Sequence, residues 1–187
     1  MKLLTLFCLL IFSLAPVAAA QEVVSARAGR IKNVRGEAFF RCHLNQKDAV
    51  PLEKGISLHN GDTVLTSEQG SVAVALNPDS YLVVSPDSFV RVEETALDAM
   101  HFDVERGEVL VISRSLAGGA SLVIHAPPAV LTVYKRGSYR IFVGENGNTE
   151  ANVGRGELRY VDSRGKLVRV KKGKQVNFVK REKTEIP

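Results

Sequence analysis

The sequence predicts an all-β fold, and its glycines and its alternating side chains are the two observations behind that prediction. Seven of the 15 glycines directly follow Lys or Arg. Because glycine readily adopts positive φ, such a pair suits a tight turn or bulge from which a strand departs. Apolar and polar residues alternate after most of these glycines, as where Leu158 and Tyr160 flank Arg159, which is the pattern of a half-buried strand. The seven glycines are Gly36, Gly55, Gly107, Gly137, Gly156, Gly165 and Gly173.

The first twenty residues have the layout of an export signal. Lys2 is their only charged residue, an apolar run extends from Leu3 to Leu14, and Ala18 and Ala20 are small. This layout predicts a secretory signal peptide, residues 1–20, that is cleaved after Ala20. The alternative is an uncleaved anchor, but the run is shorter than the ~20 residues of a membrane-spanning helix. We therefore expect a periplasmic or secreted chain with no membrane span after processing.

Residues 21–187 are expected to form one domain with a basic C-terminal end, because they suffice for a hydrophobic core and contain no long polar linker. Cys8 lies in the predicted signal, so Cys42 is the only cysteine of the processed chain. It belongs to the alternating run "AFFRCH", which favours a buried thiol over a reactive thiol or an intermolecular bridge.

Short strands are expected along the whole domain. "NPDSYLVV" from Asn77 and "SPDSFVRV" from Ser85 form a small repeat of a turn followed by a strand. "GENGN", residues 144–148, suits a hairpin link. A short helix is expected only in "VEETALDAM", residues 92–100. The spacing of the basic-glycine pairs varies from 8 to 52 residues, which excludes a strict repeat array but leaves a sandwich, a roll and a β-helical arrangement open.

From about residue 29 to residue 179 the order of these phrases resembles the FecR-type domain of bacterial envelopes. A glycine-led strand, "GRIKNVRGEAFF", is followed by "PLEKGISLHNGDTVLTSEQGSVAVAL" and "PDSYLVVSPDSFVRV". Next come "FDVERGEVLVIS", "IHAPPAVLTVYKRGSYRIFV", "TEANVGRGELRYV" and "LVRVKKGKQVNFV". The phrase "GDTVLT" at residues 61–66, with residues 70–76 after it, is the most specific part. The resemblance implies that residues 21–187 are a FecR-like β domain.

Two departures from the family bear on function. Many relatives have Gly-Thr where this chain has Gly137 and Ser138, and the following "YRIFV" occurs in only part of the family. Regulatory FecR proteins resemble anti-sigma factors and add a cytoplasmic segment and a membrane helix, neither of which we find in this sequence. The resemblance therefore implies a stand-alone domain that acts through protein contacts, and not on a sigma factor directly.

No enzymatic motif is visible in the sequence. The histidines, His43, His59, His101 and His125, lack the spacing of a zinc site, so we expect no metal and no cofactor. The carboxylate pairs Glu93 with Glu94 and Asp103 with Glu105 are spaced like solvated faces of strands or of a helical turn. There is also no G-x-S-x-G and no phosphate-binding glycine loop. We therefore expect a protein that is not an enzyme.

Charge is distributed unevenly and points to the C-terminal end. Residues 21–163 carry 15 basic and 18 acidic side chains, whereas residues 164–187 carry 9 basic and 2 acidic. Arg159, Arg169 and Lys171 occupy the polar face of expected strands, and they form a basic stripe if Arg140 lies on a neighbouring strand. Nucleic acid is a poor partner for an exported chain that has no Trp and few aromatic residues.

Two functional hypotheses remain. The first is a protein-interaction or signal-sensing module that binds an envelope protein, as the FecR resemblance implies. The alternative is a binding module for an anionic envelope polymer, either polysaccharide or lipid head groups, through the candidate residues Arg140, Arg159, Arg169 and Lys171. A solvated strand face would explain the same charges without any ligand. Salt separates the two hypotheses, because only the second predicts a steep loss of binding as ionic strength rises. The oligomeric state is left open by the sequence.

Overall fold

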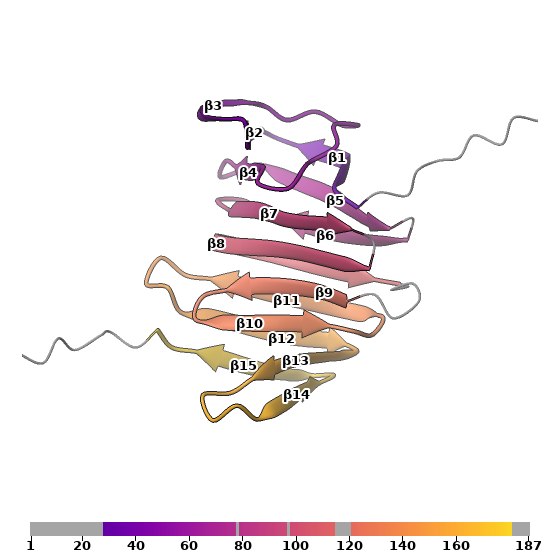
Figure 1. Ribbon diagram of the computed structural model, residues 1–187, viewed down its shortest axis with the longest axis vertical. Coiled ribbons are helices and arrows are strands. Elements are labelled where there is room, and N and C mark those ends of the chain that lie inside the picture. Colours follow the sequence, from indigo (N-terminus) through magenta and orange to yellow (C-terminus); the bar gives the residue numbers. More distant parts are fainter. Residues whose placement is uncertain (1–27, 78, 97, 115–120, 181–187) are drawn as a thin grey trace, which may run out of the picture.

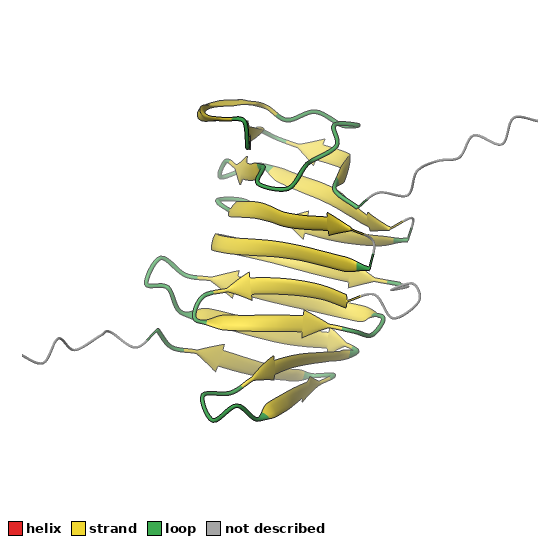
Figure 2. Ribbon diagram, in the orientation of Figure 1, coloured by secondary structure: helices red, strands yellow, loops and turns green. Residues whose placement is uncertain are grey.

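The computed structural model describes residues 28–77, 79–96, 98–114 and 121–180, in which every regular element is a β-strand (Figure 2). The all-β prediction is thus confirmed for this part of the chain. The expected signal peptide and the last seven residues lie outside the described residues. Within the described residues, no helix has the length and apolar character needed to cross a membrane.

Fifteen strands follow one another in the described residues. They are β1 (Arg30–Arg35), β2 (Ala38–Cys42), β3 (Asn45–Pro51), β4 (Thr63–Thr66), β5 (Ser71–Asn77), β6 (Ser80–Val84), β7 (Phe89–Ala96), β8 (Ala99–Ser113), β9 (Ser121–Ala126), β10 (Ala129–Val133), β11 (Gly137–Val143), β12 (Thr149–Arg155), β13 (Glu157–Val161), β14 (Leu167–Lys171) and β15 (Lys174–Phe178).

The strands lie in two layers that pack face to face (Figure 1). The front sheet has the order β3-β2-β4-β7-β8-β9-β10-β13-β14, and the back sheet has the order β1-β5-β6-β8-β11-β12-β15. Neighbouring strands are antiparallel, except that β8 and β9 are parallel. The chain adds strands from one end of the sandwich to the other, so β1 to β3 and β13 to β15 lie at opposite ends (Figure 1).

Strand β8 belongs to both sheets. Its first part pairs with β7 and β9, and from Gly107 onward it pairs with β6 and β11. Gly107 has a φ of 90°, and a Cβ atom there would lie 2.3 Å from Oγ of Ser88. The turn before β7 is bonded to this crossing, because the N–H of Glu108 donates to Oγ of Ser88 at 2.9 Å. Glycine therefore permits the close approach at which one strand changes sheets.

The core lies between the sheets and is filled by the inward side chains of alternating positions. In β6 the buried residues are Ser80, Leu82 and Val84, and Tyr81 and Val83 are half-buried. The front sheet contributes Phe102, Leu122, Ile124 and Leu131 to the same core cluster, all at most 1% exposed. Burial of each large aliphatic side chain stabilises the fold by about 1.5–3 kcal/mol.

The predicted basic-glycine turns are confirmed at five of the seven glycines, which have positive φ and lie outside the strands: Gly36, Gly55, Gly156, Gly165 and Gly173. Gly107 also has positive φ, but it lies inside β8 beside a register shift and not in a turn. Gly137 is the other exception, because it is the first residue of β11 and its φ is not positive. Glycine is required there by space, since a Cβ would lie 2.1 Å from the carbonyl oxygen of Arg155. The hairpin at residues 144–148 and the strands after both "PDS" turns are also confirmed.

The helix expected at residues 92–100 is wrong, because β7 and β8 form a hairpin there. Val92 and Met100 are at most 1% exposed, so the core holds both ends of this segment in extended strands. The carboxylate of Glu94 accepts the N–H groups of Thr95 and Ala96 at 2.9 and 3.0 Å, beside a register shift between Val92 and Glu94. Cross-strand pairing and this bulge override the local helix propensity.

Candidate interaction surface

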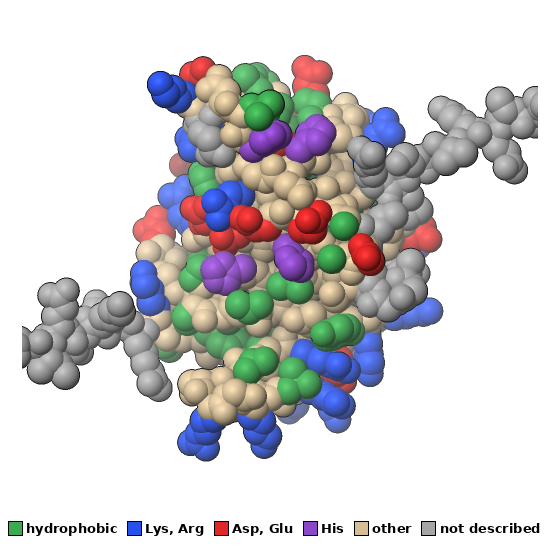
Figure 3. Space-filling model, in the orientation of Figure 1, with side chains coloured by type: hydrophobic (Ala, Val, Ile, Leu, Met, Phe, Trp, Pro, Cys, Tyr) green, Lys and Arg blue, Asp and Glu red, His purple; other side chains and the backbone are tan. Residues whose placement is uncertain are grey.

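Three of the four predicted cations lie together at the C-terminal end of the front sheet. Arg159 in β13 is directly opposite Arg169 in β14, and Lys171 is opposite Glu157. Lys135, in the turn after β10, joins them, with its Nζ 3.5 Å from Oε2 of Glu157. We call Lys135, Arg159, Arg169 and Lys171 the basic cluster. Figure 3 shows Lys and Arg side chains gathered at this end of the molecule.

Glu157 is the shared counter-ion of the basic cluster. Its side chain is 9% exposed, and Nε of Arg159 donates to its Oε1 at 2.8 Å. That hydrogen bond lowers the pKa of Glu157, burial acts in the opposite direction, and the charges of Lys135, Arg159 and Arg169 lower it further. Since three cations lie within 4.0 Å of this one carboxylate and Lys171 is opposite it in register, the cluster keeps a positive charge.

Arg159 is more tightly packed than its place in the sequence indicates. Its guanidinium lies over the ring of Tyr134, 4.6 Å from the centroid, and its side chain is 24% exposed. A charge reversal at Arg159 would place a second carboxylate beside Glu157, so it would disturb the fold as well as the surface. The exposed side chains of Arg169 and Lys171 are the better positions for testing the role of the charge.

Arg140 is separate from the basic cluster. It lies in β11 of the back sheet, where its guanidinium is 2.6 Å from Oε2 of Glu108 and 3.0 Å from Oε1 of Glu150. The condition for a single basic stripe is not met, because β11 and β13 belong to different sheets. Two carboxylates also balance the Arg140 charge, which makes this residue a cross-strand clamp.

An apolar groove of about 1,030 Å³, which we call the terminal groove, adjoins the basic cluster. It is lined by residues of β10, β13, β14 and β15, among them Val130, Tyr160, Val161, Leu167, Val176 and Phe178. Among the described residues, β14 pairs only with β13 and β15 pairs only with β12. Two sheet edges and the end of the core therefore meet at this groove.

The groove exposes apolar surface of two kinds. Tyr160 and Phe178, which pack edge to face with ring centroids 4.8 Å apart, are only half-buried at the end of the core. Val161 and its register partner Leu167 point outward and are 62% and 50% exposed. Apolar side chains that are contiguous and exposed mark binding surfaces more often than isolated ones do.

Sequence reasoning missed the groove, although a signal for it was present. The alternation that places Leu158 and Tyr160 on one face of β13 places Val161 on the opposite face with Arg159. In β14, Leu167 shares the outward face with Arg169 and Lys171 by the same rule. Val161 and Leu167 are thus apolar residues on otherwise polar strand faces. This exception to the alternation is the sequence signal for the terminal groove.

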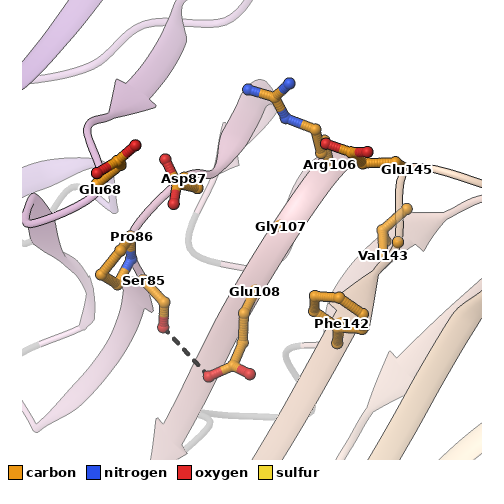
Figure 4. Close-up of a pocket in the computed structure, with 11 residues that line it drawn as sticks. Glu68, Ser85, Pro86, Asp87, Arg106, Gly107, Glu108, Phe142, Val143 and Glu145 are labelled. Atoms are coloured by element: carbon orange, nitrogen blue, oxygen red, sulfur yellow. Dashed lines mark hydrogen bonds between the residues drawn. The ribbon is translucent and has the colours of Figure 1, made fainter.

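A second cavity, of about 600 Å³, lies beside the sheet crossing of β8 (Figure 4). Glu68, Asp87, Glu108 and Glu145 line it, together with Arg106 and Phe142. Oγ of Ser85 donates to Glu108 at 3.4 Å, and Glu108 also pairs with Arg140. This cavity is acidic, and its chemistry differs from that of the terminal groove.

The structure brings three of the four histidines to carboxylates. His43 and His59 both approach Asp62, and Nδ1 of His125 is 3.2 Å from Oδ1 of Asp103. Asp103 is 9% exposed, so its interpretation as part of a solvated face is wrong, because pairing of β8 with β7 and β9 covers it. Cys42 is half-buried rather than buried.

Comparison with known proteins shows the fold alone. No family model matches the chain, and no curated protein matches it. Two crystal structures of a protein from Parabacteroides distasonis ATCC 8503, described as a "putative anti-sigma factor", are similar, each with a TM-score of 0.51 and with 16% and 15% identity. Each match covers 62% of this chain and 53% of that chain. The chain thus has a fold distantly similar to that of part of this protein, and it spans about half of that protein's length.

Proposed function

We propose that the protein is a non-enzymatic, exported FecR-type module that binds a partner protein of the bacterial envelope and so serves in interaction or signal sensing. The terminal groove carries this proposal, because it combines half-buried aromatic side chains with the outward pair Val161 and Leu167. The fold shared with the Parabacteroides distasonis protein and the FecR resemblance of the sequence support the same class of function.

The groove favours an extended partner segment. β14 and β15 each have one unpaired edge among the described residues, and an added strand satisfies such an edge with backbone hydrogen bonds. Apolar side chains of the partner would fill the groove beside Tyr160 and Phe178. The basic cluster at its margin favours a segment with acidic residues next to the apolar ones.

We expect the double variant Val161→Lys with Leu167→Lys to weaken partner binding at least tenfold, because two charges would enter an apolar contact. The partner is first captured in living cells with a photo-crosslinking amino acid at position 167, and binding of the purified pair is then titrated. Both side chains are at least half exposed, so the melting temperature should change little.

Leu44 supplies the matched control, because it is an 83% exposed apolar residue at the other end of the sandwich. Leu44→Lys should keep wild-type affinity, and a crosslinker at position 44 should not capture the same protein. If positions 44 and 167 capture the same set of proteins, or if the double variant binds as tightly as the wild type, the groove is not the binding site.

The basic cluster supports a second candidate function, the binding of anionic envelope polysaccharide or lipid head groups. Arg159 and Arg169 are like charges in direct register and share the single carboxylate of Glu157, so the pair keeps a net positive charge that an added anion would balance. We expect Arg169→Gln with Lys171→Gln to reduce retention on anionic polysaccharide and on anionic vesicles, and to flatten its dependence on salt.

Lys47→Gln with Lys54→Gln is the control for the loss of two charges, since both lysines are exposed near the opposite end. Equal retention of the two double variants would leave the basic cluster as an ordinary solvated surface. Binding of a single protein that survives moderate salt would favour the groove over the cluster.

A further inference from the structure

A second site lies at the opposite end of the front sheet, where two loops meet. Cys42 ends β2 and His43 follows it, while His59 and Asp62 belong to the loop before β4. Gly61 permits the approach, because it has a φ of 88° and a Cβ there would lie 2.8 Å from Cβ of His43. The rings of His43 and His59 are 6.3 Å apart between centroids, and Figure 3 shows two histidines side by side on this face.

Asp62 holds the two loops together. It is 1% exposed, and its two carboxylate oxygens accept the backbone N–H groups of His43 and His59 at 2.9 and 2.8 Å. Burial alone would raise the pKa of Asp62, but these two N–H groups and the His43 ring lower it below its ordinary value. A buried carboxylate that accepts a hydrogen bond from each loop therefore faces both histidine side chains.

The same carboxylate fixes the ring of His43. Nδ1 of His43 is 2.9 Å from Oδ1 of Asp62, so in the neutral ring Nδ1 carries the proton and donates it to the carboxylate. Nε2 then keeps its lone pair. A carboxylate that orients an imidazole in this way is the usual outer partner of a histidine metal ligand.

A sulfur ligand and a second imidazole lie beside this ring. Sγ of Cys42 is 3.9 Å from Nδ1 of His43, and ligand atoms of Cys42, His43 and Asp62 all lie within 4.8 Å of one another. Metal–ligand bonds of about 2.0–2.3 Å separate two ligands by roughly 3.5 Å, so an ion held by Nε2 of His43 requires the half-buried Cys42 side chain to turn from Nδ1 toward Nε2. His59 is 68% exposed and has Nδ1 3.7 Å from Oδ2 of Asp62, which leaves its ring able to turn toward an ion.

We propose that Cys42, His43 and His59 form a binding site for a borderline-soft transition-metal ion such as Zn²⁺, with Asp62 as the carboxylate that orients His43. One thiolate and two imidazoles are the ligand types that Zn²⁺ prefers, and a water completes a tetrahedral set. The exposed side of the two histidines gives the ion a path from solvent. The site is independent of the terminal groove, because the two lie at opposite ends of the sandwich.

The test uses the full chain, kept reduced so that Cys42 remains a thiol. We expect calorimetric titration with Zn²⁺ to give one equivalent bound, and Co²⁺ to give the thiolate-to-metal charge-transfer band of a cysteine ligand. Cys42→Ser should abolish that band, and both Cys42→Ser and His59→Gln should lower Zn²⁺ affinity at least tenfold. His125→Gln, which alters a histidine that contacts Asp103 elsewhere, should keep wild-type affinity.

His59→Gln keeps the proposal testable even if the cysteine variant folds poorly, because the backbone N–H of His59 still reaches Asp62. A thermal melt of each variant establishes that it is folded. The proposal is overturned if the wild type binds no Zn²⁺, if folded His59→Gln binds Zn²⁺ as tightly as the wild type, or if His125→Gln lowers the affinity equally.

Discussion

Gly107→Ala is expected to destabilise the protein by about 3 kcal/mol or more, enough to remove much of the stability of a typical domain. The φ of 90° alone disfavours any side chain. The added Cβ would also lie 2.3 Å from Oγ of Ser88, 2.5 Å from Cα of Ser88 and 2.7 Å from the carbonyl oxygen of Asp87. Two of those atoms are backbone, so the turn before β7 or the crossing of β8 must move.

Gly173→Ala separates the backbone cost from the steric one. Gly173 also has positive φ, at 73°, but nothing lies within 4 Å of a Cβ at that position. We expect the free energy of unfolding of Gly173→Ala, measured in urea, to be only about 1 kcal/mol lower than that of the wild type. Equal losses for the two variants would show that β8 does not cross between the sheets as tightly as described.

The turns and the alternation within each strand could be predicted from the sequence, because both depend on residues that are neighbours along the chain. A basic residue before glycine marks a turn at Gly36 or Gly156 whichever strand comes next, and the alternation at Leu158 and Tyr160 needs only the sequence of β13. The sandwich itself depends on contacts between distant residues. β8 is one strand of 15 residues, and no pattern in its own sequence predicts that its first and second parts pair in different sheets.

The candidate sites show the same division. Arg159 and Arg169 meet because β13 and β14 form a local hairpin, whereas the separation of Arg140 from them follows from its long-range pairing with β8. The spacing rules missed the site of Cys42, His43 and His59 because Cys42 ends β2 whereas Asp62 lies in the loop before β4, so the site comes from no single helix or knuckle. Only the fold of the chain, with Asp62 bonded to both loops, brings these side chains together.

Tyr139→Phe is expected to cost about 1–3 kcal/mol at neutral pH, because it removes one hydroxyl from a buried network. Oη of Tyr139 donates to the carbonyl oxygen of Lys135 at 2.8 Å and accepts the N–H of Glu157 at 3.1 Å. Tyr139 is 2% exposed, so water does not replace either bond. The hydroxyl thus ties the turn after β10 to the start of β13, which carries the counter-ion of the basic cluster.

The same variant should change the alkaline limit of stability. Burial raises the pKa of Tyr139 above 10.0, although the N–H of Glu157 acts in the opposite direction. Below pH 10 both states keep the phenol proton, so the stabilising contribution is fully present. As pH rises through the folded pKa, the unfolded chain has already released its proton and the contribution is lost. Urea unfolding should therefore show that the difference in free energy of unfolding between wild type and Tyr139→Phe becomes smaller above pH 10.

Tyr134→Phe is the control, because Tyr134 is 46% exposed. Its free energy of unfolding should differ little from that of the wild type both at pH 7 and above pH 10. If this difference in free energy of unfolding between wild type and Tyr139→Phe stays constant from pH 7 to above pH 10, the hydroxyl is not buried in the network between Lys135 and Glu157.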